Sequence, residues 1–137
     1  MVVFPMAVAW LGDTAAYFVG SLYGKRKLIP SVSPGKTIEG GLAGLACAIL
    51  VGGVMGWFPL EFHADNGLSA LIGGSLGLVL GIGAQLGDLA ESVMKREAGV
   101  KDSGDFFPGH GGILDRFDAL IFTIPMAYVL ISLFWFL

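Results

Sequence analysis

The stretch from Glu91 to Asp118, ESVMKREAGVKDSGDFFPGHGGILDRFD, separates two long apolar runs of the chain. It holds more than half of the Asp, Glu, Lys and Arg residues and one of the two histidines, and glycine and proline interrupt it repeatedly. A charged segment rich in turn-forming residues, placed between hydrophobic runs, is typical of a loop. We therefore expect the chemistry of the protein in this loop, with the apolar runs holding it at a membrane surface.

The composition of the whole chain is that of a membrane protein. Apolar residues make up 55% of the 137 residues, charged residues make up 14%, and the mean hydropathy is +0.77, whereas soluble chains carry roughly 25% charged residues. A net charge of −3 predicts no nucleic-acid binding. The single cysteine, Cys47, excludes an internal disulfide and a cysteine-based zinc site. The length predicts one transmembrane domain over residues 1–137.

Four apolar segments are long enough to cross a bilayer, which takes about 20 helical residues. They are Val2 to Leu22, Ile38 to Phe58, Leu68 to Leu89 and Phe117 to Leu137. The expected fold is an all-α integral membrane protein with about four transmembrane helices. Gly73, Gly77 and Gly81 recur at four-residue spacing, which predicts that helix backbones approach closely there.

The basic residues predict the orientation in the membrane. Lys25, Arg26, Lys27 and Lys36 lie in the first connection, Lys95, Arg96, Lys101 and Arg116 lie in the third, and the second has none. Because basic loops stay in the cytoplasm, the first and third connections are predicted to form a cytoplasmic polar site at the membrane rim. Both termini would then lie on the far side, which hints that this chain is the back part of a longer one.

Asp13 lies near the middle of the first apolar segment, in AWLGDTAAYFVG. A charge at such a position costs at least about 2.5–3.5 kcal/mol, so its carboxylate must face protein, water or an ion. One interpretation is a buried aspartate that is hydrogen-bonded to a neighbouring helix. The other is a member of the polar site, sharing a helix face with Tyr17 and Gly20.

The first connection contains SVSPGKTIEGG, residues 31–41. Ser33-Pro34 predicts a turn, and either Ser33 or Thr37 is a candidate cap for the second helix. Gly-Lys-Thr beside a helix start suits phosphate binding, because free backbone N–H groups attract anions. The first glycine of a P-loop is missing, so the alternative is a helix-start loop whose Lys36 contacts lipid headgroups.

Carboxylates and cations gather where the third apolar segment ends and where the fourth begins. The end, QLGDLAESVMKR, places Asp88, Glu91, Ser92 and Lys95 on one helix face, which is either an amphipathic exit helix or part of a site. The start places Asp115 and Asp118 one turn apart, after the glycine-rich GHGG of residues 109–112. Helix dipoles favour such carboxylates, but the whole set suits Mg²⁺-dependent phosphate chemistry. No serine or cysteine with a partner base indicates covalent catalysis.

Together these residues resemble the phosphatidate cytidylyltransferase family, also called CDP-diacylglycerol synthases. The similarity lies in Ser92-Val-Met-Lys95-Arg96, then Lys101-Asp102, then Pro108-x-His110-Gly111-Gly112-x-x-Asp115-Arg116-x-Asp118. Ser33-Pro34-x-Lys36-Thr37-x-Glu39-Gly40 and Asp13-x-x-Ala16-Tyr17 are similar to the upstream elements of the family. The resemblance covers nearly the whole chain and corresponds to the C-terminal half of family members.

The resemblance implies a reaction in which CTP and phosphatidate give CDP-diacylglycerol and pyrophosphate. It implies Mg²⁺, with a second divalent or monovalent ion allowed, held by Asp88 and Asp115 and supported by Asp118 and Asp13. The implied catalytic residues are Lys95, Arg96, Lys101, Asp102, His110 and Arg116. The implied substrate-binding residues are Ser33, Lys36, Thr37, Glu39, Ser92, Gly111 and Gly112. It also implies a bacterial inner-membrane protein with its site on the cytoplasmic side, and it allows a homodimer.

Three alternatives remain open at this point. The first is another membrane enzyme that uses CTP or phosphate, such as a polyprenol kinase or an archaeal-lipid cytidylyltransferase. The second is a non-enzymatic ion-binding membrane subunit, in which Asp13 and Asp88 would form an ion path. The third is a fragment that folds without turning over.

Overall fold

The computed structural model describes residues 2–58, 66–99 and 114–136, and within the last range it describes the side chains of Ala119–Leu133. These residues form four helices and one hairpin. The helices are α1 (Val3–Tyr23), α2 (Ile38–Trp57), α3 (Asn66–Glu97) and α4 (Leu114–Phe136), and the strands are β1 (Lys27–Ile29) and β2 (Ser33–Thr37). The predicted all-α fold is confirmed.

Three of the described helices are long and apolar enough to cross a membrane. They are α1, α2 and the part of α3 from Gly67 to Glu97, and the described apolar part of α4 is the shorter Ala119–Leu133. Large apolar side chains such as Trp10, Leu50 and Leu71 are exposed along these helices, as expected for surfaces that face lipid. The chain is therefore a membrane protein.

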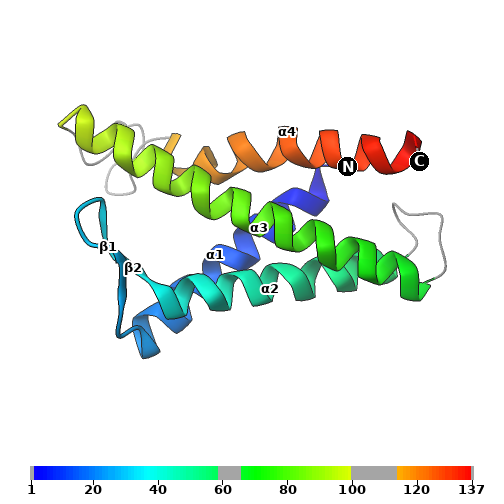
Figure 1. Ribbon diagram of the computed structural model, residues 1–137, viewed down its shortest axis with the longest axis horizontal. Coiled ribbons are helices and arrows are strands. Elements are labelled where there is room, and N and C mark those ends of the chain that lie inside the picture. The colour runs from blue at the N-terminus through cyan, green and yellow to red at the C-terminus, as the bar shows by residue number, and fades with distance from the viewer. Residues whose placement is uncertain (1, 59–65, 100–113, 137) are drawn as a thin grey trace.

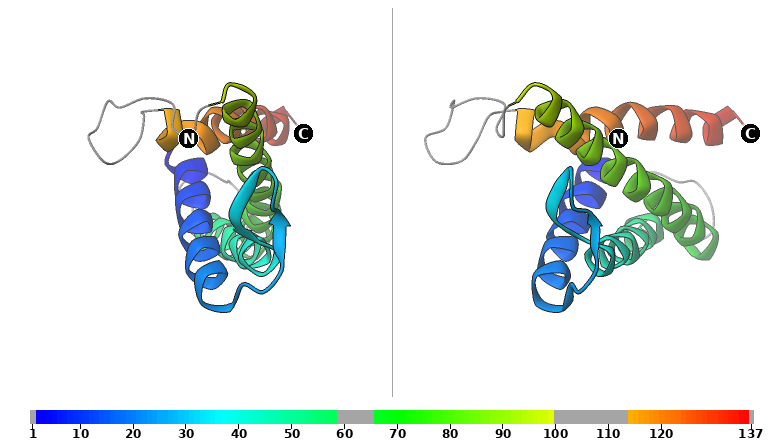
Figure 2. Two further views of the ribbon diagram at one scale, coloured as in Figure 1. Left: turned by 90° about the vertical axis from the view of Figure 1, so that its left-hand side faces the viewer. Right: turned by 60° about the vertical axis from the view of Figure 1, so that its left-hand side comes forward.

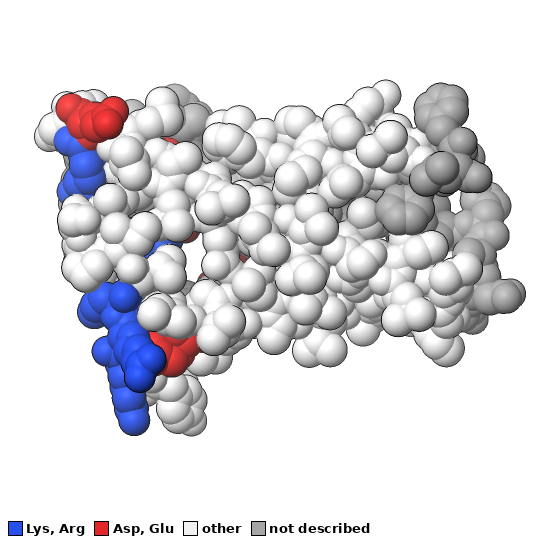
Figure 3. Space-filling model, in the orientation of Figure 1, with Lys and Arg blue, Asp and Glu red and all other residues white. Residues whose placement is uncertain are grey.

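Successive helices run in alternating directions, so their ends gather at two opposite poles (Figure 1). The hairpin, the end of α1, the start of α2 and the end of α3 lie together at one pole (Figures 1 and 2). On the face drawn in Figure 3, the described Lys, Arg, Asp and Glu side chains gather at that same pole. The predicted clustering of charge at one end of the helices is confirmed.

Glycines bring the helix backbones together. A Cβ at Gly52 would collide with the carbonyl oxygen of Gly73, and a Cβ at Gly73 would collide with that of Gly52. One turn along α3, Gly77 meets the backbone of Ala48 in the same way. The interpretation of these glycines as packing residues is confirmed, because only a residue without a Cβ allows such an approach.

The apolar core lies where the four helices meet. Phe4, Val8, Leu80 and Ile131 are buried in one cluster, and a smaller cluster of Ala9, Ala84, Ala119 and Leu120 continues it. Small residues dominate the second cluster, so α1, α3 and α4 approach closely on the side of the charged pole.

The predicted helix through Asp88, Glu91 and Lys95 is confirmed. The third helix continues past the end of the apolar segment at Leu89 to Glu97, because helix-favouring residues follow and Glu91 pairs with Lys95 one turn on, at 3.4 Å. It ends where Gly99 adopts a φ of 70°, a conformation that glycine reaches without strain.

The predicted turn at Ser33-Pro34 is wrong. Those residues lie in β2, and the turn falls on Pro30–Val32, closed by a hydrogen bond from the Val32 N–H to the Ile29 carbonyl, at 3.2 Å. Pro34 has no N–H to donate, and a two-stranded ribbon tolerates this because each strand has an unpaired edge. The sequence did not reveal the hairpin, since its strands are short and polar.

Candidate active site

A cavity of about 460 Å³ opens at the charged pole, between α1, the hairpin, α2 and α3. Its volume is in the range of small-molecule sites. Five residues predicted to bind metal or substrate line it: Asp13, Ser33, Lys36, Thr37 and Asp88. They come from three separate elements, α1, β2 and α3, so the cavity exists only in the folded chain.

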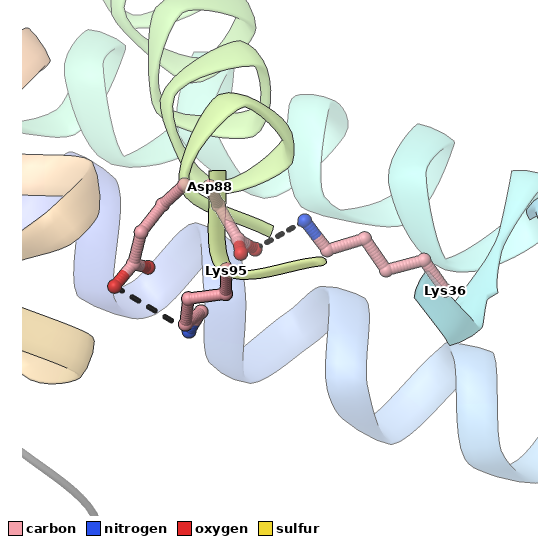
Figure 4. Close-up of polar contacts among 4 residues, drawn as sticks. Lys36, Asp88 and Lys95 are labelled. Carbon is pink, nitrogen blue, oxygen red and sulfur yellow. Dashed lines mark ion pairs between the residues drawn. The ribbon is translucent and has the colours of Figure 1, made fainter. Parts of the chain in front are cut away.

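Lys36 and Asp88 meet across this cavity. The Lys36 Nζ lies 2.5 Å from the Asp88 Oδ2, in an ion pair that joins β2 to α3 (Figure 4). The contact lacks the geometry of a hydrogen bond, although the ammonium nitrogen itself is shielded from solvent. Both side chains are partly exposed, so the pair contributes at most about 1 kcal/mol to stability. Its importance is positional, because it places a cation and a carboxylate side by side in the wall of the cavity.

A second ion pair continues the charged face of α3. The Lys95 Nζ lies 3.4 Å from the Glu91 Oε1, also drawn in Figure 4. Glu91 is buried, with 8% of its surface exposed. The predicted common face of Asp88, Glu91 and Lys95 is thus present, but among the described residues only Asp88 of that face lines the cavity.

Asp13 is an exposed residue that lines the cavity from α1. This agrees with the interpretation of Asp13 as a member of the polar site and disagrees with that of a buried aspartate. A Cβ at the neighbouring Gly12 would lie 3.4 Å from the Gly44 carbonyl oxygen. The close approach of α1 to α2 at this level therefore brings the Asp13 carboxylate into the cavity wall.

Thr37 caps helix α2 at the floor of the cavity. Its Oγ1 accepts a hydrogen bond from the Gly40 N–H at 3.2 Å, which confirms one of the two predicted caps. The side chain is buried, and a Cβ at Gly20 would lie 2.9 Å from the Thr37 Oγ1. Thr37 thus joins the end of α1 to the start of α2, and its hydroxyl is engaged in the cap.

Glu39 and Arg96 hold the hairpin rather than line the cavity. The Glu39 Oε2 accepts hydrogen bonds from the backbone N–H groups of Lys25 and Arg26, each at 3.2 Å. At the other end of the hairpin, the Arg96 Nε donates to the Val32 carbonyl at 3.3 Å. The hairpin is therefore tied to α2 at its base and to α3 at its turn, and it forms one wall of the cavity.

Three polar residues that line the cavity, Tyr17, Ser21 and Gln85, had no role predicted from the sequence. Tyr17 shares a helix face with Asp13, which was noted but not given a role. Gln85 lies three residues before Asp88, and its Nε2 donates to the Gly41 carbonyl at 2.9 Å. An amide in an otherwise apolar segment, one turn from a predicted metal ligand, was the signal that could have identified it.

Several predicted residues fall outside the part of the chain that the structure describes. Lys101, Asp102, His110, Gly111 and Gly112 lie between α3 and α4. The side chains of Asp115, Arg116 and Asp118 are also outside it, although their backbones belong to the first turns of α4. Ser92 is described on α3 but is not among the residues that line the cavity. The roles predicted for all these residues stay predictions.

Comparison with known proteins identifies the family. The model of the cytidylyltransferase family matches residues 1–134. The chain belongs to the cytidylyltransferase family. The first and third connections, which supply the predicted motifs, both lie inside the matched range.

Curated relatives of this cytidylyltransferase chain are bacterial. A phosphatidate cytidylyltransferase of Staphylococcus epidermidis is 48% identical over 130 residues, which are 95% of this chain and 48% of the relative. The phosphatidate cytidylyltransferase of Staphylococcus haemolyticus is also 48% identical, and that of Staphylococcus aureus is 45% identical, over the same shares. The chain thus spans about half the length of the curated relatives it matches.

Proposed function

We propose that the chain carries the catalytic site of a phosphatidate cytidylyltransferase, which makes CDP-diacylglycerol and pyrophosphate from CTP and phosphatidate. The observation that supports this most is the cavity at the charged pole of a membrane protein, where Lys36 and Asp88 form an ion pair and Asp13 lines the same wall. A nucleotide and a lipid headgroup can both reach that place, because it lies where the apolar helices end.

The proposed reaction does not require a strong general base. A phosphatidate oxygen forms a bond to the α-phosphorus of CTP, and the bond from that phosphorus to the β-phosphate oxygen breaks, releasing pyrophosphate. A phosphate monoester has a second pKa of about 6, so the attacking group is already largely dianionic at neutral pH. The protein must instead bring two polyanions together and balance their charge. We assign the binding of phosphate oxygens to Lys36, with Lys95, Arg96, Lys101 and Arg116 as further candidates.

Mg²⁺ is the proposed cofactor. Among the described residues, no group of three His, Cys, Asp or Glu side chains is placed to hold a metal ion. Mg²⁺ commonly takes only one or two carboxylates and completes its shell with phosphate oxygens and water, so Asp88 and Asp13 in one cavity fit it. The ion would neutralise phosphate charge during transfer. Asp115 and Asp118 are the proposed additional ligands, and a second ion remains part of the proposal.

We also propose that the site faces the cytoplasm of a bacterium, at its inner membrane. The support is the charge distribution, since the described basic residues gather at the hairpin pole and basic loops stay in the cytoplasm. A homodimer remains a prediction that has no structural support so far.

The test is a CTP-dependent assay with phosphatidate and Mg²⁺ that measures both CDP-diacylglycerol and pyrophosphate. It is run on the purified chain in lipid nanodiscs, and on a chimera in which this chain replaces the matching half of the S. epidermidis relative. We expect equal amounts of the two products from at least the chimera. A well-folded chimera without product, beside an active parent enzyme, contradicts the proposal. Cation flux into liposomes without CTP would instead favour an ion-binding subunit.

A further inference from the structure

Gln85 holds a position in α3 that helix packing alone does not explain. It is an uncharged polar residue in an apolar helix, one turn before Asp88, and both residues line the cavity. Since a helix rises about 1.5 Å per residue, Gln85 lies about 4.5 Å farther from the hairpin than Asp88 does.

The orientation of the Gln85 amide is determined by its partner. The Nε2 donates to the Gly41 carbonyl of α2 at 2.9 Å, and a carbonyl can only accept. The Oε1 is therefore the atom of this amide that can accept a hydrogen bond from a ligand. A glutamine whose amide group is held at one end presents that acceptor in a defined direction.

Two glycines on α2 make room for this amide. A Cβ at Gly41 would lie 3.3 Å from the Gln85 Oε1, and a Cβ at Gly44 would lie 3.4 Å from the Nε2. The distance at Gly41 is tighter than ordinary side-chain contacts, so a larger residue there would displace the amide. At Gly44 the amide would be in ordinary contact, and the tight neighbour is the Gly12 carbonyl oxygen at 3.0 Å. The small residues of α2 thus leave the space that the side chain of Gln85 in α3 occupies.

The polar groups of the cavity are divided along its length. Lys36 supplies a cation at the hairpin end, next to Asp88. Farther along the helices, where Gln85 contacts Gly41 and Gly44, the wall offers the Gln85 Oε1 as an acceptor. A ligand that fits this division carries anionic groups at one end and N–H or O–H donors at the other. A nucleoside phosphate has both, whereas the acyl chains of a phospholipid have no donors.

We infer that Gln85 is a specificity-determining residue of the nucleotide site, whose Oε1 accepts a hydrogen bond from an amino or hydroxyl group of the nucleoside. This inference rests on the proposed function, because it takes the nucleotide phosphates to lie at Lys36. It assigns the inner part of the cavity to the nucleoside rather than to the lipid.

The experiment compares Gln85→Met, which has a similar shape but no amide, with wild type and with the control Ser75→Ala. Ser75 is another polar residue of α3, and its hydroxyl donates to the Ile72 carbonyl at 2.7 Å, away from the cavity. Three quantities are measured: KM for CTP, KM for phosphatidate, and the Kd of α,β-methylene-CTP without turnover. Discrimination of CTP against UTP and against 2′-deoxy-CTP is measured beside them.

Loss of one hydrogen bond is expected to raise the CTP KM and the analogue Kd about tenfold. The phosphatidate KM and the thermal midpoint should change little, and discrimination against one of the two competing nucleotides should fall by a similar factor. Gln85→Glu, which cannot donate to Gly41 but keeps an acceptor, should lose less discrimination than Gln85→Met.

Unchanged nucleotide binding in Gln85→Met would overturn the inference. Equal rises in both KM values with a lower thermal midpoint would also overturn it, because Gln85 would then serve only to pack α2 against α3. If the wild type binds the analogue but forms no CDP-diacylglycerol from CTP and phosphatidate, the proposed reaction fails while the Kd comparison still decides the role of Gln85. If the wild type binds no nucleotide, both proposals fail.

Discussion

Glycine has opposite roles in the two halves of the α2–α3 interface. Away from the hairpin, Gly52 and Gly56 of α2 face Gly73 of α3, and the backbones touch. Near the hairpin, Gly41 and Gly44 lie beside Gln85. They leave space for its polar side chain, which lines the cavity. A glycine that faces another glycine therefore brings the two backbones into contact. A glycine that faces a longer polar residue leaves space for that side chain.

The two halves of the interface differ in the kind of contact that holds the helices together. In the glycine-on-glycine half, dispersion contacts between backbones hold the helices. In the half near the hairpin, polar groups face a cavity, and each must find a partner in the protein or in a ligand. The first half should respond to substitution through stability, and the second through activity. The four predictions below test this division.

Asp88→Asn should have the largest effect on activity. Removing the carboxylate takes away the proposed Mg²⁺ ligand and the partner of Lys36, so turnover should fall on the order of a hundredfold or more. The thermal midpoint should change by only a few degrees, because the ion pair is partly exposed. The measurement is CDP-diacylglycerol formation as a function of Mg²⁺ concentration. Wild-type activity at limiting Mg²⁺ would exclude Asp88 as a metal ligand.

Gly52→Ala should have the largest effect on stability. The new Cβ would collide with the Gly73 carbonyl, and overpacking of this kind costs about 1–3 kcal/mol. The matched control is Gly53→Ala on the same helix, where the Cβ would lie 3.5 Å from the Ala70 carbonyl oxygen, an ordinary contact. Unfolding in mixed micelles should show a loss for the first and little change for the second. Equal losses would mean that close backbone approach is not what holds α2 to α3.

Arg96→Ala should loosen the hairpin with a moderate effect on activity. Its hydrogen bond to the Val32 carbonyl ties the hairpin turn to α3, so amide exchange of residues 31–33 should accelerate severalfold. The CTP KM should rise a few-fold because one wall of the cavity becomes mobile. Lys25→Ala, which removes the same charge at the base of the hairpin, is the control and should leave the exchange at the turn unchanged. Unaltered exchange in Arg96→Ala would contradict the role of Arg96 as a tie.

Glu39→Gln should have the smallest effect. The variant keeps an oxygen that can accept from the Lys25 and Arg26 N–H groups, but hydrogen bonds to a neutral acceptor are weaker than those to a carboxylate. We expect a small loss of stability and faster exchange at residues 25 and 26 only. Glu39→Ala should cost more, since it leaves both donors without this acceptor. A large rise in CTP KM for Glu39→Gln would mean that Glu39 contacts substrate, as the family resemblance implies.

The sequence predicted the features that depend on periodicity and charge. The bilayer has a fixed thickness and excludes charged groups. These constraints account for the four apolar segments, the glycine spacing in α3 and the gathering of basic residues at one pole. Thr37 as a helix cap followed from local chemistry in the same way. The motif residues on two separate connections also indicated that Ser33–Gly40 faces the end of α3, and the contact of Lys36 with Asp88 confirms it.

The hairpin and the role of Gln85 were not predictable from local patterns. The hairpin strands are too short and polar to show alternation. They are held by hydrogen bonds to Glu39 and to Arg96, and Arg96 is distant in sequence. The role of Gln85 depends on its contacts with Gly41 and Gly44, which lie on another helix. By itself, then, the sequence determined a membrane-spanning helical protein with a charged pole and a set of candidate residues. Only the tertiary structure decided which of them share a cavity, because helix crossings set by backbone contact between glycines determine which side chains meet.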